Sequence, residues 1–341
     1  MMRQIEPVAI LTPVCEEQLH PFLAEYSELG NLVSFAGIPE GSVNTNYRVE
    51  TSRDPARPYF LRIYEEQAID GARLEAETLL HLASRGVPCT APILRLDGER
   101  IGQLAGKPAA LFAWCDGTMR CQASVSVRDA WQVGAALARI HVAGGERWSG
   151  RAGRFGPAEL RLRLPRIAAA SDPTLAAWAE PLGRALDANE ARRRKDLPKG
   201  LVHGDLFRDN ILWDEAGAIT TLLDFESAFV GTFAFDLMVT ILSWCVGDAL
   251  RPELARAMVS GYESVRELTL EERDGLYGEA CYAALRFSIT RITDFAMRAN
   301  TLKDYRRFIM RYQTLEQMGH EGLARILFDD GPERAPAPSG T

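Results

Sequence analysis

The sequence predicts an α+β protein of two lobes: a small antiparallel sheet with one helix, then a larger, mainly helical lobe. Strand-like apolar runs fall almost entirely before residue 113, and helical periodicity dominates from residue 118 onward. The main exception is a pair of short apolar runs, Ile211–Trp213 and Ile219–Leu223, on either side of the turn Asp214-Glu215-Ala216-Gly217. This pattern predicts a hairpin carried by the helical lobe.

The elements of the first lobe follow from hydrophobic periodicity and turn residues. Helices are predicted over residues 16–26 and 70–85, the second ended by Gly86 and Pro88. The strand-like segments are residues 31–36, 43–50, 59–64, a hairpin of 93–96 and 100–104 around Asp97-Gly98-Glu99, and 109–113.

The second lobe is predicted to begin with a helix at the capping box Ser126–Asp129. Residues 233–245 predict a buried helix that contains Asp236, a carboxylate that needs partners when buried. Further helices are expected within residues 158–194 and over residues 252–266, 271–300 and 304–327.

Polar residues flank the open end of the predicted hairpin, opposite its turn. His203-Gly204-Asp205 is followed after four residues by Asn210, and the second strand ends at Asp224-Phe225-Glu226. This is the spacing of the kinase loop H-x-D-x-x-x-x-N with a later D-F-x metal site. Asp205 fits the carboxylate that accepts a hydroxyl proton, and Asn210 and Asp224 fit oxygen ligands of Mg²⁺. The alternative is that these residues only cap strand ends.

Two features of the first lobe fit a nucleotide site. The turn from Gly37 to Ser42 lies between two predicted strands, where glycine lets backbone N–H groups approach a phosphate. Arg62 stands on the third strand, where a kinase places its phosphate-binding lysine, and its guanidinium also suits phosphate. Glu75 lies on the buried face of the following helix and is our candidate partner for Arg62. An exposed strand arginine and a solvated glutamate are the alternatives.

The motifs HGDLFRDNIL, LLDFE and FDL resemble those of the aminoglycoside phosphotransferase and choline kinase superfamily. Within it, the FRDN and SWC motifs and the segment FAGIPEGSVNTNYRV are similar to the kinase-like homoserine kinases. The resemblance covers nearly the whole chain. It implies a protein-kinase-like fold and the use of ATP and Mg²⁺.

The polar, glycine-containing segment Trp114-Cys115-Asp116-Gly117 predicts a hinge at 114–117 between lobes of residues 1–113 and 118–330. The tail at 331–341 is rich in Pro and small residues and is predicted to be disordered. The resemblance implies roles for further residues. The backbone from Ala113 to Cys115 would face adenine, Asp236 would hold the catalytic-loop backbone, and His141 would be a packed structural histidine. The residues in or beside the nucleotide loop would be Gly41, Ser42, Asn44 and Asn46.

An amino-acid acceptor would need a cation for its carboxylate and an anion for its ammonium. Arg286 and Arg291 lie in RFSITR, which resembles the corresponding run of the homoserine kinases. Five residues apart on a helix, they point about 140° apart, so one would bind substrate while the other serves structure. Packing or surface ion pairs are the alternative roles. The candidates for the ammonium are Asp209, Glu226 and Asp294.

The composition excludes several classes of function. The net charge of −7 disfavours a general nucleic-acid binder. The six cysteines lack C-x-x-C spacing, which disfavours a disulfide framework or a zinc site and fits a reducing cytoplasm. We find no signal peptide or membrane span in the sequence. We therefore expect a cytoplasmic monomer or homodimer whose partner is a small-molecule substrate.

The resemblance implies ATP-dependent phosphorylation of a small-molecule hydroxyl, L-homoserine to O-phospho-L-homoserine in threonine biosynthesis. The alternatives are a kinase for another amino alcohol, a sugar or an aminoglycoside, or a protein Ser/Thr kinase of the same superfamily. A catalytically dead nucleotide-binding or scaffold protein would be a different class. The presence of Asp205, Asn210 and Asp224 together argues against it.

Overall fold

The computed structural model describes residues 11–39, 43–145, 153–298 and 303–329. Contacts divide the chain into two compact units, which we describe separately. Unit 1 comprises residues 1–120, 149–151 and 209–228, and unit 2 comprises residues 121–148, 152–208 and 229–341. The predicted tail, residues 331–341, lies outside the described residues, as do Gly41 and Ser42.

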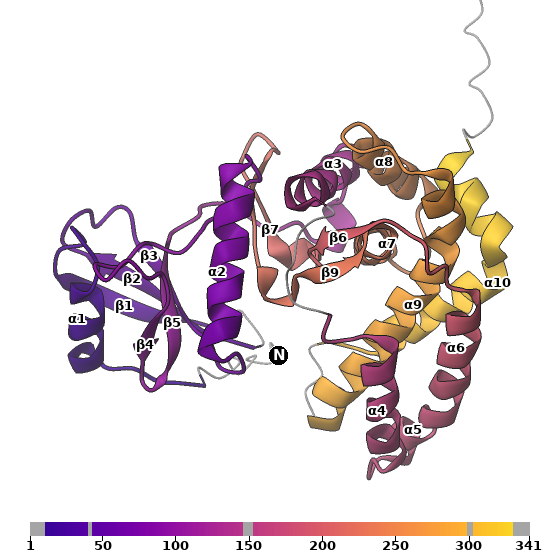
Figure 1. Ribbon diagram of the computed structural model, residues 1–341, viewed down its shortest axis with the longest axis horizontal. Coiled ribbons are helices and arrows are strands. Elements are labelled where there is room, and N and C mark those ends of the chain that lie inside the picture. Colours follow the sequence, from indigo (N-terminus) through magenta and orange to yellow (C-terminus); the bar gives the residue numbers. More distant parts are fainter. Residues whose placement is uncertain (1–10, 40–42, 146–152, 299–302, 330–341) are drawn as a thin grey trace, which may run out of the picture. The chain divides into compact units, whose positions relative to one another are not determined.

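Unit 1 is built on a five-stranded antiparallel sheet in the order β1-β2-β3-β5-β4 (Figure 1). Its strands are β1 Leu32–Ile38, β2 Thr45–Thr51, β3 Tyr59–Ile63, β4 Gly102–Leu104 and β5 Lys107–Ala113, and its helices are α1 Glu16–Ala24 and α2 Ile69–Ser84. Alternate strand residues such as Val49, Leu61 and Leu111 form a core with Leu19 and Phe22 of α1. Each such side chain contributes roughly 1.5–3 kcal/mol by burial.

The predicted hairpin of residues 93–96 and 100–104 is wrong. The turn at Gly98 does form, but its first flank bonds to other partners: Ile93 N donates to Leu111 O (2.7 Å) and Leu96 N donates to Glu25 O (2.8 Å). Strand β4 pairs instead with β5 through a tight turn at Ala105 and Gly106, both with positive φ. That backbone conformation is the one a two-residue hairpin requires, although Ala105 gives no sequence signal for it.

The predicted hairpin of residues 211–213 and 219–223 is confirmed. Strands β7 Ile211–Trp213 and β8 Ile219–Leu222 pair antiparallel, with the short helices η2 Arg208–Asn210 before them and η3 Phe225–Ser227 after them. By its contacts this segment groups with unit 1, whereas the residues before and after it belong to unit 2.

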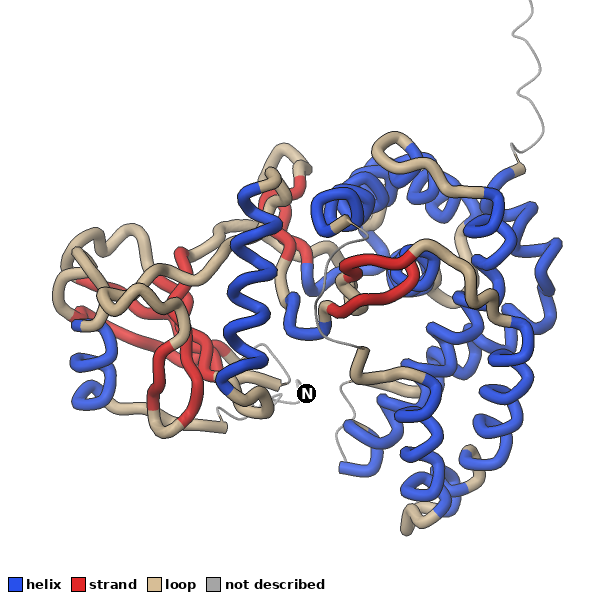
Figure 2. The backbone as a smooth tube through the Cα atoms, in the orientation of Figure 1, coloured by secondary structure: helices blue, strands red, loops and turns tan. Residues whose placement is uncertain are grey.

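Unit 2 is mainly helical, as predicted, and it contains a strand pair, β6 Lys199–Val202 and β9 Phe229–Thr232, that we did not predict (Figure 2). Every residue of α7 is buried, and α7 packs against helices α3, α8 and α9 and both strands. The helices are α3 Val127–Gly144, α4 Pro157–Ala168, α5 Pro173–Ala176, α6 Ala179–Arg192, α7 Phe233–Trp244, α8 Pro252–Glu263, α9 Leu270–Asp294 and α10 Arg306–Phe328, with the short turns η1 Gln122–Ser124 and η4 Ala296–Arg298.

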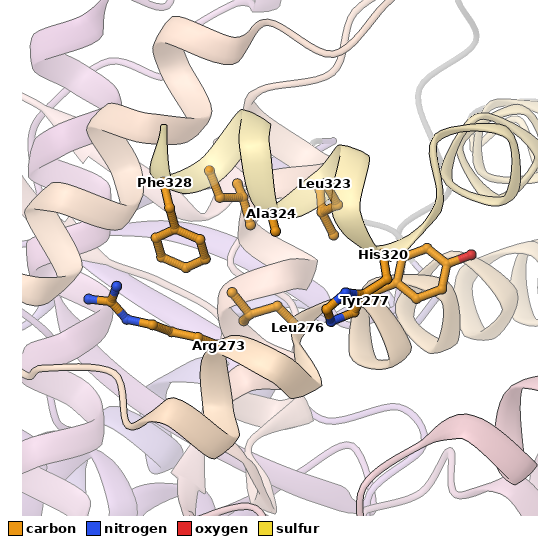
Figure 3. A pocket seen from close by; sticks show the side chains of 8 residues that line it. Arg273, Leu276, Tyr277, His320, Leu323, Ala324 and Phe328 are labelled. Carbon is orange, nitrogen blue, oxygen red and sulfur yellow. The ribbon is translucent and has the colours of Figure 1, made fainter. Parts of the chain in front are cut away.

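Helix α10 packs along α9 and breaks at Gly319, whose φ is 68°. Figure 3 shows the shallow pocket that side chains of both helices line beyond this break. Its walls are apolar apart from Tyr277, His320 and Arg273, and the Arg273 guanidinium lies 4.7 Å from the centre of the Phe328 ring. In the part of the chain that the structure describes, no helix has the length and apolar character needed to cross a bilayer.

Glycines let α3 and α8 approach closely. A Cβ atom at Gly134 would lie 2.0 Å from Met258 O, and one at Gly261 would lie 1.9 Å from Trp131 O. Neither backbone oxygen can move without shifting its helix. The packing of α3 on α8 therefore requires glycine at both positions.

We expect Gly261→Ala to lower the free energy of unfolding by about 1–3 kcal/mol because the new methyl group forces the helices apart. Denaturant unfolding measures this. The matched control is Gly183→Ala on α6, where the added Cβ would meet only Leu164, at an ordinary 3.4 Å. That control should be neutral or slightly stabilising. Equal unfolding midpoints for the two variants would show that the helices are not in tight contact.

Candidate active site

Asp236 anchors the catalytic loop within unit 2. It lies in the first turn of α7, which begins at the capping residue Thr232. Its carboxylate is fully buried and accepts hydrogen bonds from His203 N (2.7 Å) and Gly204 N (2.8 Å), so it holds the backbone immediately before Asp205. The role that the family resemblance implied for Asp236 is confirmed.

His141 also contacts this carboxylate. Its Nε2 lies 3.1 Å from Asp236, and its Nδ1 lies 2.7 Å from the hydroxyl of Tyr262. Because burial lowers the pKa of His141 despite the nearby carboxylate, we assign a neutral ring that donates from Nε2 and accepts at Nδ1. His141 is thus a packed structural histidine, as predicted.

The ionised form of Asp236 is favoured although the group is buried. Burial by itself would raise the pKa of this carboxyl, but hydrogen bonds from His141 and the Gly204 amide, with the nearby His203, lower it below its ordinary value. A carboxylate that accepts several N–H donors is stabilised in its charged form.

Arg286 supports the same loop from α9. It is buried and donates from Nη1 to Gly204 O (3.0 Å), and the same nitrogen lies 3.9 Å from Asp205 Oδ1. Its guanidinium carbon lies 3.8 Å from the centre of the Phe287 ring and 4.6 Å from that of Phe155. Arg286 is therefore held beside the candidate base by the loop carbonyl and two aromatic rings.

The C-terminal end of α7 holds the rest of the loop. Trp244 Nε1 donates to Leu206 O (2.9 Å), and Arg208 donates to Ser243 O. Ser243 and Trp244 belong to the SWC motif, whose structural role the sequence did not indicate. The loop is therefore bonded to α7 at both ends of the helix.

In unit 1, Asn210 and Asp224 lie at the open end of the hairpin. Leu223 N donates to Asn210 O (2.9 Å), which brings the backbone before Asp224 against Asn210. Asp224 has a left-handed backbone (φ 64°), a conformation uncommon for residues other than glycine. Such strain is retained where a side chain must be aimed in a particular direction.

Arg62 and Glu75 form the predicted pair, with Arg62 Nη1 3.3 Å from Glu75 Oε1. The same nitrogen lies 3.8 Å from Asp224 Oδ1. Burial lowers the pKa of Arg62, but Glu75 and Asp224 outweigh this and raise it above its ordinary value. The guanidinium is thus a fixed positive charge beside Asp224.

The nucleotide-loop candidates that the structure describes also converge in unit 1. Asn44 Nδ2 donates to Glu226 Oε2 (2.5 Å), and Asn44 Oδ1 accepts from Glu65 N (3.2 Å). Asn46 lies opposite Arg62 in the sheet. The link from Asn44 to Glu226, across 182 residues of sequence, was not predicted.

The two residues assigned to adenine lie at the end of β5 and just after it. Ala113 ends β5, and Cys115 Sγ lies 3.0 Å from Thr90 Oγ1. The six cysteines are all free thiols.

Four further residues were candidates for binding the substrate. Arg291 donates to Asp304 O (3.1 Å), and Asp294 pairs with Arg163 Nη1 (2.5 Å). Asp209 is exposed in η2. Glu226 is buried and bonded to Asn44.

The donor set near Asp224 fits a magnesium ion. No group of three or more His, Cys, Asp or Glu side chains forms a metal cage among the described residues. Mg²⁺ bound with a nucleotide needs only one or two protein oxygens, because phosphates and water complete its shell. Asp224 Oδ1 is buried and has no hydrogen-bond partner among the described residues, as expected of an oxygen meant for a cation.

Known proteins resemble this chain in both sequence and fold. The model of the phosphotransferase enzyme family matches residues 34–268. The homoserine kinase of Nitrobacter winogradskyi is 35% identical over 84% of this chain and 87% of that protein. The homoserine kinase of Chelativorans sp. is 37% identical over 84% and 88%, and that of Afipia carboxidovorans is 31% identical over 93% and 98%.

Solved structures share the fold at lower sequence identity. The amicoumacin kinase hAmiN, in complex with AMP-PNP and Ca²⁺, has a TM-score of 0.66 at 16% identity and covers 90% of this chain and 97% of its own. A microcompartment-associated aminopropanol kinase has a TM-score of 0.62 at 19% identity and covers 90% and 98%.

We expect Asp236→Asn to destabilise the protein by about 3–5 kcal/mol at neutral pH, because an amide cannot accept all the N–H groups that Asp236 satisfies. The folded state lowers the pKa of Asp236. Its contribution is therefore complete above the ordinary carboxyl pKa of about 3.9 and is lost as the pH falls through the folded-state value.

Unfolding measured from pH 7 to pH 3 tests this. The difference in free energy of unfolding between wild type and Asp236→Asn should narrow below about pH 4. The control is Asp70→Asn, because Asp70 is exposed and its loss should have little effect. A difference in free energy of unfolding that stays constant with pH would contradict an ionised Asp236.

Proposed function

The chain belongs to the phosphotransferase enzyme family, and we propose that it transfers the γ-phosphoryl group of ATP to the hydroxyl of L-homoserine. The observation that carries this is the similarity to homoserine kinases, 31–37% identity over 84–93% of the chain. The products are O-phospho-L-homoserine and ADP. The enzyme is an ATP-dependent alcohol phosphotransferase, and we place its reaction in the cytoplasm as a step of threonine biosynthesis.

The residues of the catalytic loop take the roles that their chemistry allows. Asp205 orients the homoserine hydroxyl and accepts its proton as the oxygen attacks the γ-phosphorus. The bond from that phosphorus to the β–γ bridging oxygen breaks, and ADP leaves with the electron pair. Arg62, held by Glu75, contacts the phosphates in place of the usual lysine.

Asn210 and Asp224 hold the metal, and we propose Mg²⁺ as the ion. When bound, it neutralises charge on the phosphates. Asn44, Asn46 and the turn at Gly41 and Ser42 line the nucleotide, and the backbone from Ala113 to Cys115 faces adenine. The contact of Asn44 with Glu226 supports a joint role for the nucleotide turn and the D-F-E segment.

The direct test is a coupled assay of ADP release by the purified protein with homoserine and a panel of amino alcohols and sugars. Homoserine should have the highest kcat/KM. A clear preference for another alcohol would replace homoserine as the substrate while leaving the phosphotransferase assignment intact.

We expect Asp205→Asn to lower kcat by about 10²–10⁴-fold, the range typical for loss of a general base. The amide preserves shape but cannot take the proton. Affinity for Mg²⁺ and ATP, measured by calorimetry, should stay within a few-fold because the metal ligands remain. A variant that keeps near wild-type kcat would reject Asp205 as the base.

We expect Asp224→Asn to weaken binding of ATP in the presence of Mg²⁺ and to abolish transfer, because a charged metal ligand is lost. Asn tolerates the left-handed backbone, so the fold should be retained. Nucleotide titrations with Mg²⁺ and with EDTA measure the effect. An unchanged dependence on Mg²⁺ would rule out Asp224 as a ligand.

A further inference from the structure

Arginines gather in unit 2 beyond the catalytic loop, and we call Arg208, Arg291 and Arg311 the arginine cluster. Arg208 donates to Ser243 O, and Arg311 donates to Val246 O (3.2 Å). These carbonyls belong to the end of α7 and the residues just after it. Arg291 donates to another backbone oxygen, Asp304 O (3.1 Å).

The rings of Phe207, Phe287 and Phe308 pack against the cluster. The guanidinium carbons of Arg291 and Arg311 lie 4.5 Å and 4.3 Å from the centre of the Phe308 ring. Arg291 also lies 5.7 Å from Phe207. The Phe308 ring thus lies against two positive groups.

Arg311 is the member whose charge is least compensated. It has no ion pair with Asp or Glu in the described ranges, and its Nε is buried without a hydrogen-bond partner among them. Burial, with the nearby Arg291 and Arg208, lowers the pKa of Arg311 to about 9. Positive groups that disfavour one another in this way gain stability when an anion enters.

The position of the cluster identifies the anion. Phe207 is two residues and Arg208 three residues after Asp205 in the catalytic loop. The Phe207 ring packs on those of Phe287 (5.0 Å between ring centres) and Phe308 (6.2 Å), and Arg311 lies over the Phe308 ring. The anion therefore belongs to a molecule that also reaches the catalytic loop, and the proposed acceptor carries a carboxylate besides its hydroxyl.

Arg286 makes different contacts from those of the arginine cluster. It donates to Gly204 O, lies near Asp205, and is stacked on Phe155 and Phe287. It serves the loop and the base. Arg291, five residues further along α9, is turned to the Phe308 ring and Asp304.

We propose that the arginine cluster, with Arg311 as its principal member, binds the α-carboxylate of the acceptor amino acid. This rests on the proposed function and names the residue that separates amino-acid acceptors from amino alcohols. A guanidinium fork matches a carboxylate through two parallel hydrogen bonds. Arg311 is one of several arginines on the amphipathic helix α10, so sequence periodicity gives no sign of this role.

The test compares homoserine with 3-aminopropanol, which lacks the carboxylate, in wild type and Arg311→Met. Methionine retains an apolar stem against Phe308, and unfolding curves verify that the variant folds. The KM for homoserine should rise by about 30-fold or more. The KM values for 3-aminopropanol and for ATP should stay within a few-fold of wild type.

The matched control is Arg325→Met, which removes one exposed positive charge from the same helix. It should leave all three KM values unchanged. Equal losses for homoserine and 3-aminopropanol in Arg311→Met would overturn the proposal, as would no loss for either compound.

Calorimetric titration of homoserine separates this proposal from the proposed function. If wild type binds homoserine without phosphorylating it, the proposed function fails. Loss of that binding in Arg311→Met would still support the carboxylate site, and retained binding would overturn it. A wild-type protein that does not bind homoserine rejects both.

Discussion

Unit 2 is organised around the hydrogen bonds that the carboxylate of Asp236 accepts. It is fully buried, so the free energy of removing its charge from water has to be offset by hydrogen bonds. The amides of His203 and Gly204 and the ring of His141 provide them. The same bonds fix the backbone that carries Asp205. A continuous set of contacts then runs from His141 through Tyr262 to Arg266 and Glu272 at the start of α9, so the loop is tied to the helical core.

The sequence predicted the fold wherever periodicity and local signals were sufficient. The capping box at Ser126, the buried helix α7 and the catalytic hairpin all form. The error over residues 93–104 has a physical cause, because a turn signal such as Asp97-Gly98 specifies a reversal but not the partner of each flank. Strand pairing across distant residues, as in β6 with β9, leaves no local signal either.

Some contacts of the candidate site could be predicted from the sequence and others could not. The pair of Arg62 and Glu75 could be anticipated, since helical periodicity places Glu75 on the face that packs on the sheet. The bond of Asn44 to Glu226 could not, because it joins residues 182 apart that share no spacing. Arg208, Ser243 and Trp244 were missed for a related reason: their partners are backbone carbonyls, and such contacts do not constrain residue type strongly enough to form a motif.

Phosphoryl transfer explains why so many contacts converge on one short loop. Its transition state is loose, with little covalent chemistry for the protein to perform, so catalysis depends mainly on position and charge. The backbone around Asp205 is accordingly held from several sides. Asp205 N donates to His203 Nδ1 (3.3 Å), the Gly204 amide to Asp236, and Arg286 to the Gly204 carbonyl. Because Arg286 donates to the loop carbonyl, we propose a different guanidinium for the substrate carboxylate. Arg311, half-buried on α10, lies among other arginines and has no acidic partner among the described residues, and it is the guanidinium that we propose for this role.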